Sequence, residues 1–286
     1  RSQRKGFGGF GGKNDGPLAL GHSLLRRAIG VSGNVICDLD GVVYRGTRAI
    51  SGAADALRDL QAGGLNLLFC TNNSSRTPSE VAEVIESVTG FRALPSQVLG
   101  SAMAAATLLA IDKPLTYVLG GNGIHAALAE VGIKTTESDT DARAVVVGID
   151  MELSYERLRR AAQAAANGAR LIATNDDPTY PAEDGFWPGA GSILAAVETA
   201  SGRRAEVAGK PHRPMRDLIR SHLVEGAVWV VGDRPDTDLA LAEAEADWQS
   251  ILVLTGVVDR PDGVTPAPDL VCDDLAAAAA AILSTR

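Results

Sequence analysis

Four clusters of polar residues, each placed directly after a short apolar run, hold the residue types that phosphate chemistry needs. They are Asp38-Leu39-Asp40-Gly41, Thr71-Asn72-Asn73-Ser74, Gly209-Lys210-Pro211 and Gly232-Asp233-Arg234-Pro235-Asp236-Thr237-Asp238. Crowded carboxylates repel one another unless a hard cation neutralises them, and Mg²⁺ prefers oxygen ligands. A lysine and a hydroxyl beside such an ion suit a phosphate dianion better than a neutral substrate.

The aspartates of these clusters also offer covalent and acid–base chemistry. Asp38 and Asp233 can each give one carboxylate oxygen to a cation. No serine–histidine pair is placed to activate a water, so a carboxylate nucleophile is the natural alternative. Asp40 lies two residues after Asp38, where it can protonate a leaving alcohol and later deprotonate water. One such aspartate is ordinary turn chemistry, but four clusters in this order favour a functional site.

The chain from Asn34 onward predicts a scaffold that brings these clusters together. Apolar runs alternate with helical patterns, which is typical of an α/β fold with a mainly parallel sheet and helices on both faces. Ligands bind beyond the carboxyl ends of such strands, so we expect all four apolar runs to end at one edge of one sheet. Strands are expected at 35–37, 65–70, 117–119, 144–149, 171–173, 227–231 and 251–254. Helices are expected at 53–61, 102–109, 155–166, 193–200, 215–223 and 238–246, after a capping box at 77–80 and after Asp273-Asp274.

Together the clusters resemble the four motifs of the haloacid dehalogenase-like (HAD) hydrolases. The residues that carry the resemblance are DLDGVVYRG at 38–46, Thr71-Asn72-Asn73, Lys210 and GDRPDTD at 232–238. The likeness extends from about Asn34 to Val258. It points to the nagD-like branch, which includes 4-nitrophenyl phosphatases and phosphatases of glycerol phosphate, phosphoglycolate and pyridoxal phosphate. It implies a Rossmann-like core with a large inserted α/β cap domain.

The resemblance also implies roles for individual residues. Asp38 would be the nucleophile that forms an aspartyl-phosphate, and Asp40 the general acid and base. Three residues would hold the phosphoryl group: Thr71, Asn72 and Lys210. The ligands of Mg²⁺ would be Asp38, the backbone carbonyl of Asp40, and Asp233, while Asp238 would fix the water shell of the metal. An Asp two residues after the nucleophile marks phosphoryl transfer in this superfamily, which disfavours a dehalogenase.

Thr71 of the second cluster and Lys210 of the third are separated by the 138 residues from 72 to 209, far more than a short link needs. This length leaves room for a second α/β unit, and nagD-like enzymes insert their cap at this point. We expect a Gly/Arg-rich disordered tail at 1–33, a core domain at 34–101 and 187–286, and a cap domain at 102–186. Closure of the cap would exclude water and complete the pocket. Caps of this type often pair two copies, so a homo-oligomer is expected through the cap.

The segment from Asn175 to Trp187 is the candidate for substrate selection. The stretch TNDDPTYP at 174–181 resembles a Thr-Asn-x-Asp segment of the nagD-like branch. With Trp187, it supplies Asn175, Asp177 and Tyr180 near the junction of cap and core. The alternative is a packed loop whose Asn and Asp side chains serve as caps, and the sequence leaves the two interpretations level.

A rival motif lies at 121–126. Gly121-Asn122-Gly123-Ile124-His125-Ala126 fits the G-x-G-x-x-G/A dinucleotide fingerprint and follows a short strand. Its acidic partner would fall among Glu137, Asp139 and Asp141. A lone match is weak, so we interpret the glycines as the turn into a cap helix. A non-catalytic nucleotide-binding module is the alternative.

Composition limits the class of protein. The 286 residues are 45% hydrophobic and 22% charged, as in globular proteins. The net charge of −8 argues against a nucleic-acid binder, and the apolar stretches are too short to span a membrane. Cys37, Cys70 and Cys272 indicate reduced thiols in a cytoplasmic protein rather than a disulfide scaffold.

The sequence therefore predicts a Mg²⁺-dependent phosphatase that hydrolyses a small phosphate monoester through an aspartyl-phosphate. A phosphotransferase or phosphomutase shares the first half of this reaction and passes the phosphoryl group to an alcohol instead of water. The substrate stays open among glycerol phosphate, phosphoglycolate, pyridoxal phosphate, sugar phosphates and nucleoside monophosphates.

Overall fold

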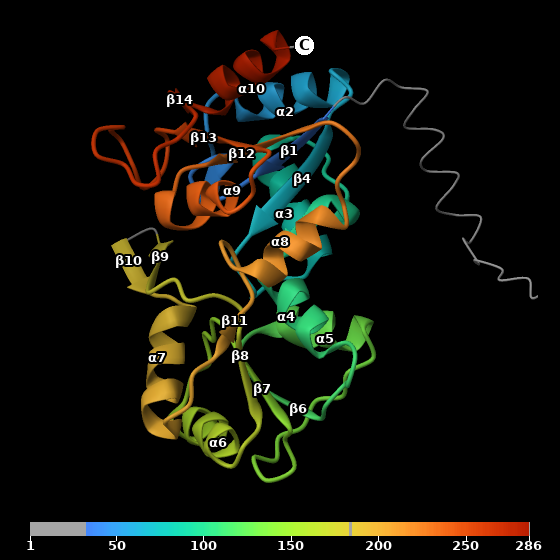
Figure 1. Ribbon diagram of the computed structural model, residues 1–286, viewed down its shortest axis with the longest axis vertical. Coiled ribbons are helices and arrows are strands. Elements are labelled where there is room, and N and C mark those ends of the chain that lie inside the picture. Colours follow the sequence, from blue (N-terminus) through green and yellow to red (C-terminus); the bar gives the residue numbers. More distant parts are fainter. Residues whose placement is uncertain (1–32, 183–184, 286) are drawn as a thin grey trace, which may run out of the picture.

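The computed structural model describes residues 33–182 and 185–285 and contains two parallel sheets, each with helices on both faces (Figure 1). The α/β fold with a second α/β layer, expected from the sequence, is confirmed. The expected Gly/Arg-rich tail at 1–33 lies outside the described residues except for Gly33, which begins the first strand. None of the described helices has the length and apolar character needed to cross a membrane.

The larger sheet has, among the described residues, six parallel strands in the order β14-β13-β12-β1-β4-β5. Their bounds are β1 Gly33–Cys37, β4 Asn66–Thr71, β5 Val98–Gly100, β12 Ala227–Gly232, β13 Trp248–Val253 and β14 Leu270–Cys272. The central strands are buried and rich in Val, Leu and Ile, as expected of strands covered on both faces. Strands β1, β4 and β12 lie side by side, so the first, second and fourth polar clusters emerge at the same edge.

Helices cover both faces of this sheet because its side chains alternate between them. Val35 and Cys37 of β1 enter one apolar cluster and Ile36 enters the other. The first face is covered by α2 (Ala53–Ala62), α3 (Pro78–Thr89) and α10 (Leu275–Ser284). The second face is covered by α4 (Ser101–Leu109), α8 (Arg213–Arg220) and α9 (Ala240–Glu243). The predicted capping box between Thr77 and Glu80 and the cap at Asp274 are confirmed at the starts of α3 and α10.

The smaller sheet, in the same described part of the chain, has four parallel strands in the order β11-β8-β7-β6. Their bounds are β6 Thr116–Leu119, β7 Ala144–Val147, β8 Arg170–Ala173 and β11 Glu206–Val207. One face packs on α6 (Tyr155–Ala166) and α7 (Ala190–Ser201). The other face packs on α5 (Asn122–Glu130) and α4, and its side chains join those of the larger sheet in one apolar cluster. The two sheets therefore share a buried seam at α4 (Figure 1).

The short strand β11 differs from the sequence expectation. Glu206 pairs with Ile172 and Val207 with Ala173, so β11 belongs to the smaller sheet. The prediction that all four polar clusters follow strands of one sheet is therefore wrong for the cluster that contains Lys210. A two-residue strand carries too little pattern to identify its sheet. Because α7 and β11 both pack in the smaller layer, we propose that the cap extends to Ala208 and that the chain returns to the core at Gly209, not at 187.

Two antiparallel hairpins, which periodicity does not reveal, contribute residues to one cleft. One is formed by β2 (Tyr44–Arg45) and β3 (Arg48–Ala49), the other by β9 (Thr179–Ala182) and β10 (Gly185–Pro188). The helix expected at 238–246 is instead the π-helical turn η2 (Pro235–Leu239) followed by α9, and a short 3₁₀ turn, η1 (Pro95–Gln97), precedes β5.

Candidate active site

Asp38 lies directly beyond the end of β1, where the central strand leaves the apolar core. Its backbone N–H donates to Val231 O at 2.9 Å, which extends the pairing with β12 by one residue and fixes the direction of the side chain. Its carboxylate Oδ1 accepts a hydrogen bond from Lys210 Nζ at 2.5 Å. The side chain keeps 12% of its surface exposed and lines a cleft, so it is accessible to a small substrate.

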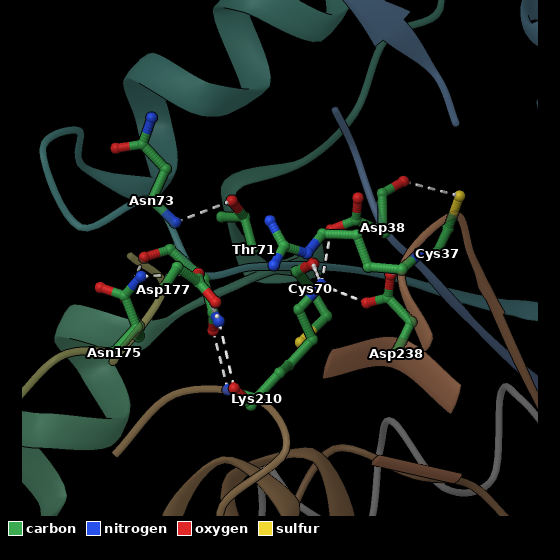
Figure 2. Close-up of polar contacts among 12 residues, drawn as sticks. Cys37, Asp38, Cys70, Thr71, Asn73, Asn175, Asp177, Lys210 and Asp238 are labelled. Atoms are coloured by element: carbon green, nitrogen blue, oxygen red, sulfur yellow. Dashed lines mark hydrogen bonds and ion pairs between the residues drawn. The ribbon is translucent and has the colours of Figure 1, made fainter. Parts of the chain in front are cut away.

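Lys210 reaches this carboxylate from the loop that follows β11. Its Nζ also donates to Asp238 Oδ1 at 2.7 Å and to Cys70 O at 3.0 Å (Figure 2). Burial by itself lowers the pKa of Lys210, but the carboxylates of Asp238 and Asp38 outweigh this effect and raise the pKa well above its ordinary value. Lys210 is therefore a buried ammonium whose donors all have acceptors.

Asp38, Asp233 and Asp238 bring one carboxylate oxygen each to within 4.8 Å of one another. The two oxygens of Asp238 accept from Lys210 Nζ and from Arg234 N, at 2.7 and 3.2 Å. Asp233 Oδ2 accepts from Val257 N at 2.7 Å, whereas its Oδ1 is buried and has no hydrogen-bond partner within the described residues. A buried oxygen without a partner is costly unless a cation satisfies it.

The electrostatics of the cluster fit a divalent cation. Burial, followed by the charge of Asp238, raises the pKa of Asp233 to about 7. Burial also raises the pKa of Asp38 well above its usual value, with Asp238 and Asp233 adding to the effect against the charge of Lys210. Oxygen donors of this kind are the ligands that Mg²⁺ prefers. The residues present therefore fit a magnesium ion held by Asp38 and Asp233, with Asp238 outside the direct ligands.

Asp40 lines the same cleft two residues after Asp38. The turn that connects Asp40 to β2 is closed by a hydrogen bond from Gly41 N to Tyr44 O at 2.8 Å. Gly41 has a φ of +86°, and a Cβ there would lie 2.5 Å from Asp233 Oδ2, so glycine is required. Burial raises the pKa of Asp40, while the charges of Arg76 and Lys210 lower it. A raised pKa suits a group that must carry a proton to a leaving oxygen.

Thr71 and Asn72 follow β4 beside Asp38. Thr71 Oγ1 accepts from Asn73 N at 3.1 Å and lines the cleft. Asn72 Oδ1 accepts from Lys210 N at 2.7 Å, and its Nδ2 donates to Lys210 O and to Asp177 Oδ2. The Asn72 side chain therefore holds the backbone of Lys210 instead of pointing to a phosphate. We propose that Asn72 binds the phosphate through its backbone N–H instead of its side chain.

The cap residues expected to select the substrate divide into two pairs. Asn175 Nδ2 donates to Asp177 Oδ2 at 2.7 Å, and Asp177 in turn accepts from Asn72 of the core. Tyr180 and Trp187 face each other across the β9–β10 hairpin with ring centroids 6.1 Å apart and planes at 79°. Both aromatic residues line the cleft. We therefore propose that Tyr180 and Trp187 select the substrate. Asn175 and Asp177 are instead hydrogen-bonded to each other and, through Asp177, to Asn72 of the core.

The cleft itself is an open space of about 1290 Å³ between core and cap. The β2–β3 hairpin contributes Arg45 and Arg48, and the loop after β12 contributes Arg234. Sequence reasoning missed these arginines as lining residues, although two of them lie within eight positions of Asp40. The guanidinium of Arg45 donates to Thr255 O, and that of Arg234 pairs with Asp236.

The rival glycine motif has a packing explanation. β6 leads into α5, and Gly123 N donates to Ser75 O at 3.1 Å. A Cβ on Gly123 would lie 2.4 Å from Arg76 O and 2.5 Å from Ser74 O. The interpretation of these glycines as a turn into a helix is confirmed, and their lack of side chains allows α5 to contact the 72–76 loop closely.

Three features of the site define a class of phosphoryl-transferring hydrolases. They are an aspartate at the end of the central strand, a buried lysine, and an acidic cation site beneath a second α/β layer. Family models agree. One described as haloacid dehalogenase-like hydrolase matches residues 35–134, and one described as HAD-hydrolase-like matches residues 207–278.

Individual relatives share most of their length with this chain. An acid sugar phosphatase of Staphylococcus haemolyticus is 37% identical over 226 residues, which are 78% of this chain and 85% of that protein. A glycerol phosphate phosphatase of Mycobacterium tuberculosis, solved with calcium, superposes with a TM-score of 0.79 at 36% identity, covering 85% of this chain and 74% of that one. A p-nitrophenyl phosphatase of Archaeoglobus fulgidus gives 0.80 at 28% identity, covering 88% and 99%. The chain belongs to the haloacid dehalogenase-like hydrolases, in their nagD-like phosphatase branch.

Proposed function

We propose that this phosphatase hydrolyses a small phosphate monoester with Mg²⁺ through an aspartyl-phosphate on Asp38. The observation that carries the proposal is the Lys210 ammonium between Asp38 and Asp238, beside a buried Asp233 oxygen that lacks a partner in the described residues. This arrangement supports a site in which a dianion and a cation bind side by side. The glycerol phosphate phosphatase of M. tuberculosis, which has also been solved with magnesium, supports the choice of metal.

The first half-reaction uses residues on both sides of the phosphorus. An oxygen of Asp38 bonds to phosphorus while the bond from phosphorus to the leaving oxygen breaks, and Asp40 gives its proton to that oxygen. Lys210 and Thr71 hold the phosphoryl oxygens and offset their charge. A bound Mg²⁺, held by Asp38, the Asp40 carbonyl and Asp233, would supply further neutralisation of that charge.

The second half-reaction restores the site. Asp40, now a carboxylate, takes a proton from a water whose oxygen bonds to phosphorus. The bond between phosphorus and Asp38 breaks, so that inorganic phosphate leaves and the Asp38 carboxylate is regenerated. An alcohol in place of water would give phosphotransfer, which is the alternative reaction for the same residues.

The cleft supports a phosphorylated metabolite of sugar-phosphate or glycerol-phosphate size. Arginines of the β2–β3 hairpin and the Tyr180–Trp187 pair line the cleft. Guanidinium groups suit hydroxyl-rich or anionic leaving groups, and aromatic faces suit the apolar face of a sugar ring.

The test is phosphate release from 4-nitrophenyl phosphate and from a panel of metabolite monoesters, with Mg²⁺ and with a chelator. We expect Mg²⁺-dependent release that Asp38→Asn abolishes while the thermal unfolding curve stays cooperative. Full activity of Asp38→Asn, or of chelated protein, would overturn the proposal. Labelled substrate incubated with glycerol separates hydrolysis, which yields labelled phosphate, from phosphotransfer, which yields labelled glycerol phosphate.

A cytoplasmic location and pairing through the cap are parts of the proposal. The three cysteines, all in the described part of the chain, are free and buried, which supports a reducing compartment. Light scattering of the full chain, compared with a variant carrying charged residues on the cap surface, checks the pairing.

A further inference from the structure

We propose that Asp177 of the cap is a positioning residue for Lys210 of the core and that it acts through the side-chain amide of Asn72. The inference rests on the proposed phosphatase function and assigns Asp177 a task other than substrate selection. Lys210 needs such support because it lies three residues beyond β11, a strand of two residues that pairs on one side only with β8 in the described chain.

The backbone of Lys210 is held by one side chain. Asn72 Oδ1 accepts from Lys210 N at 2.7 Å, and Asn72 Nδ2 donates to Lys210 O at 3.1 Å. This double contact requires a very close approach of the amide. A Cβ at the preceding Gly209 would lie 2.5 Å from Asn72 Oδ1, which explains the glycine at that position. The orientation of the Asn72 amide therefore decides where the Lys210 backbone sits.

Asp177 fixes that orientation because a carboxylate only accepts hydrogen bonds. Its Oδ2 lies 3.0 Å from Asn72 Nδ2 and 2.7 Å from Asn175 Nδ2 (Figure 2 shows Asn175, Asp177 and Lys210). A half-turn of the Asn72 amide would place its oxygen against the carboxylate and its NH₂ group against the N–H of Lys210. Both contacts would be repulsive, so Asp177, together with Lys210 N–H, holds the amide in the one orientation that accepts from Lys210.

The position of the Lys210 ammonium depends on this support of the backbone. The Nζ is buried and its donors are already assigned to Asp38, Asp238 and Cys70. Asn175 is 6% exposed and Lys210 3%, so little water is available to replace a lost contact. A shift of the Lys210 backbone therefore moves the ammonium relative to Asp38 and to the bound phosphoryl group. Misplacement by about 1 Å lowers rates by about a hundredfold in enzymes.

The decisive experiment is a double-variant cycle on the full chain. Asp177→Ala should lower kcat/KM for 4-nitrophenyl phosphate by about ten- to a hundredfold and raise the inhibition constant of inorganic phosphate. Asp177→Asn keeps a carbonyl oxygen for the two amide donors and should recover most of the activity. Asn72→Ala should be impaired, and adding Asp177→Ala to it should cause little further loss, because the link is already broken.

Asp139→Ala is the matched control, since Asp139 is a cap aspartate that pairs with Arg159 at 3.3 Å. It should stay within about twofold of the wild type. Wild-type kinetics of Asp177→Ala, or losses for Asp177→Ala and Asn72→Ala that simply multiply in the double variant, would overturn the inference. Thermal unfolding confirms that each variant folds, and should Asp177→Ala fail to fold, Asp177→Ser takes its place in the cycle.

An inactive wild type would instead count against the proposed function. The positioning link would then be measured by calorimetric titration with inorganic phosphate and Mg²⁺. Asp177→Ala should weaken phosphate binding in the wild-type background but not in the Asn72→Ala background. Equal weakening in both backgrounds would reject the link independently of catalysis.

Discussion

Asp38 and Asn72 both follow central strands of the larger sheet, and both line the cleft. The carboxylate of Asp38 accepts a hydrogen bond from Lys210 Nζ. The side-chain amide of Asn72 is hydrogen-bonded to Lys210 and Asp177, which are 138 and 105 positions away along the chain. Residue type and a strand end therefore predict which groups gather at the edge, whereas the pairing of individual donors depends on side-chain geometry that a pattern does not contain.

The charge of Arg76 provides a pH test of Asp40. Burial raises the pKa of Asp40 and Arg76 lowers it, so Arg76→Met should raise this pKa further. Asp40 must be protonated when an alkyl oxygen leaves, so the alkaline limb of kcat/KM should move to higher pH. The shift should be small, because Arg76 is exposed and solvent screens its charge. The measurement is the pH profile of glycerol phosphate hydrolysis.

Arg92→Met serves as the control for Arg76→Met. Arg92 is an exposed arginine that does not contribute to the pKa shift of Asp40. Its removal should leave the alkaline limb in place. A limb that moves to lower pH in Arg76→Met would contradict the assignment of Asp40 as the proton donor.

At the scale of elements, local chemistry predicted the starts of helices better than it predicted short strands. Thr77 and Glu80 form the capping box that the residue types predict, and Asp274 caps α10. The two hairpins were not predicted and β11 was assigned to the wrong sheet, because strands of two to four residues carry too little pattern. These short elements line the cleft or lead into Lys210, so the least predictable elements are those that shape the site.

The capping box at the start of α3 can be tested by Thr77→Ala. The change removes the acceptor of the Glu80 backbone N–H, at 3.2 Å, and one donor to the Glu80 carboxylate. The free energy of unfolding should fall by about 1 kcal/mol, measured by urea denaturation. Ser79→Ala, two residues along the same exposed turn, should cost less, and an equal loss would show that the box contributes nothing specific.

The β9–β10 hairpin should influence which leaving groups are accepted. Trp187 is 41% exposed and stands edge-on to Tyr180 at the cleft. Trp187→Ala should lower kcat/KM for sugar phosphates roughly three- to tenfold more than for 4-nitrophenyl phosphate, because an aromatic contact contributes about 0.5–1.5 kcal/mol. The control is Tyr155→Ala, an aromatic residue of the cap that is 84% exposed. An unchanged ratio between the two substrates would remove the hairpin from substrate selection.

At the scale of the whole molecule, the two sheets act together on the site. They share an apolar cluster that includes Ile36 and Leu68 of the larger sheet and Val146 and Ile172 of the smaller one. Alternation of strands and helices predicted two α/β layers, and the motifs predicted which edge holds the chemistry. The sequence pattern did not reveal that the strand before Lys210 belongs to the smaller sheet, because the contact of its ammonium with Asp38 and Asp238 arises only when the layers meet.

Magnesium should stabilise the whole fold. A ligand that binds only the folded state at a hundred times its Kd adds about 2.7 kcal/mol to the free energy of unfolding. For a chain of 286 residues this corresponds to a rise in Tm of roughly 5 °C. The expected result is a concentration-dependent rise in Tm with Mg²⁺ that a chelator reverses. Asp233→Asn should lose most of this response, because it removes a charged oxygen from the cluster.

In metal-free protein, Asp233→Asn should instead be more stable than wild type at alkaline pH. The pKa of Asp233 is raised to about 7 in the fold, by burial and then by Asp238, so the folded state binds a proton that the unfolded chain has already released. The free energy of unfolding of chelated wild type should therefore fall as pH rises from about 5 to 8. Asn carries no charge, so chelated Asp233→Asn should show a smaller fall and a higher Tm than wild type at pH 8. A variant that is less stable than wild type under both conditions would mean that the buried carboxylate is stabilised by the protein itself, and that the case for a cation at this position is wrong.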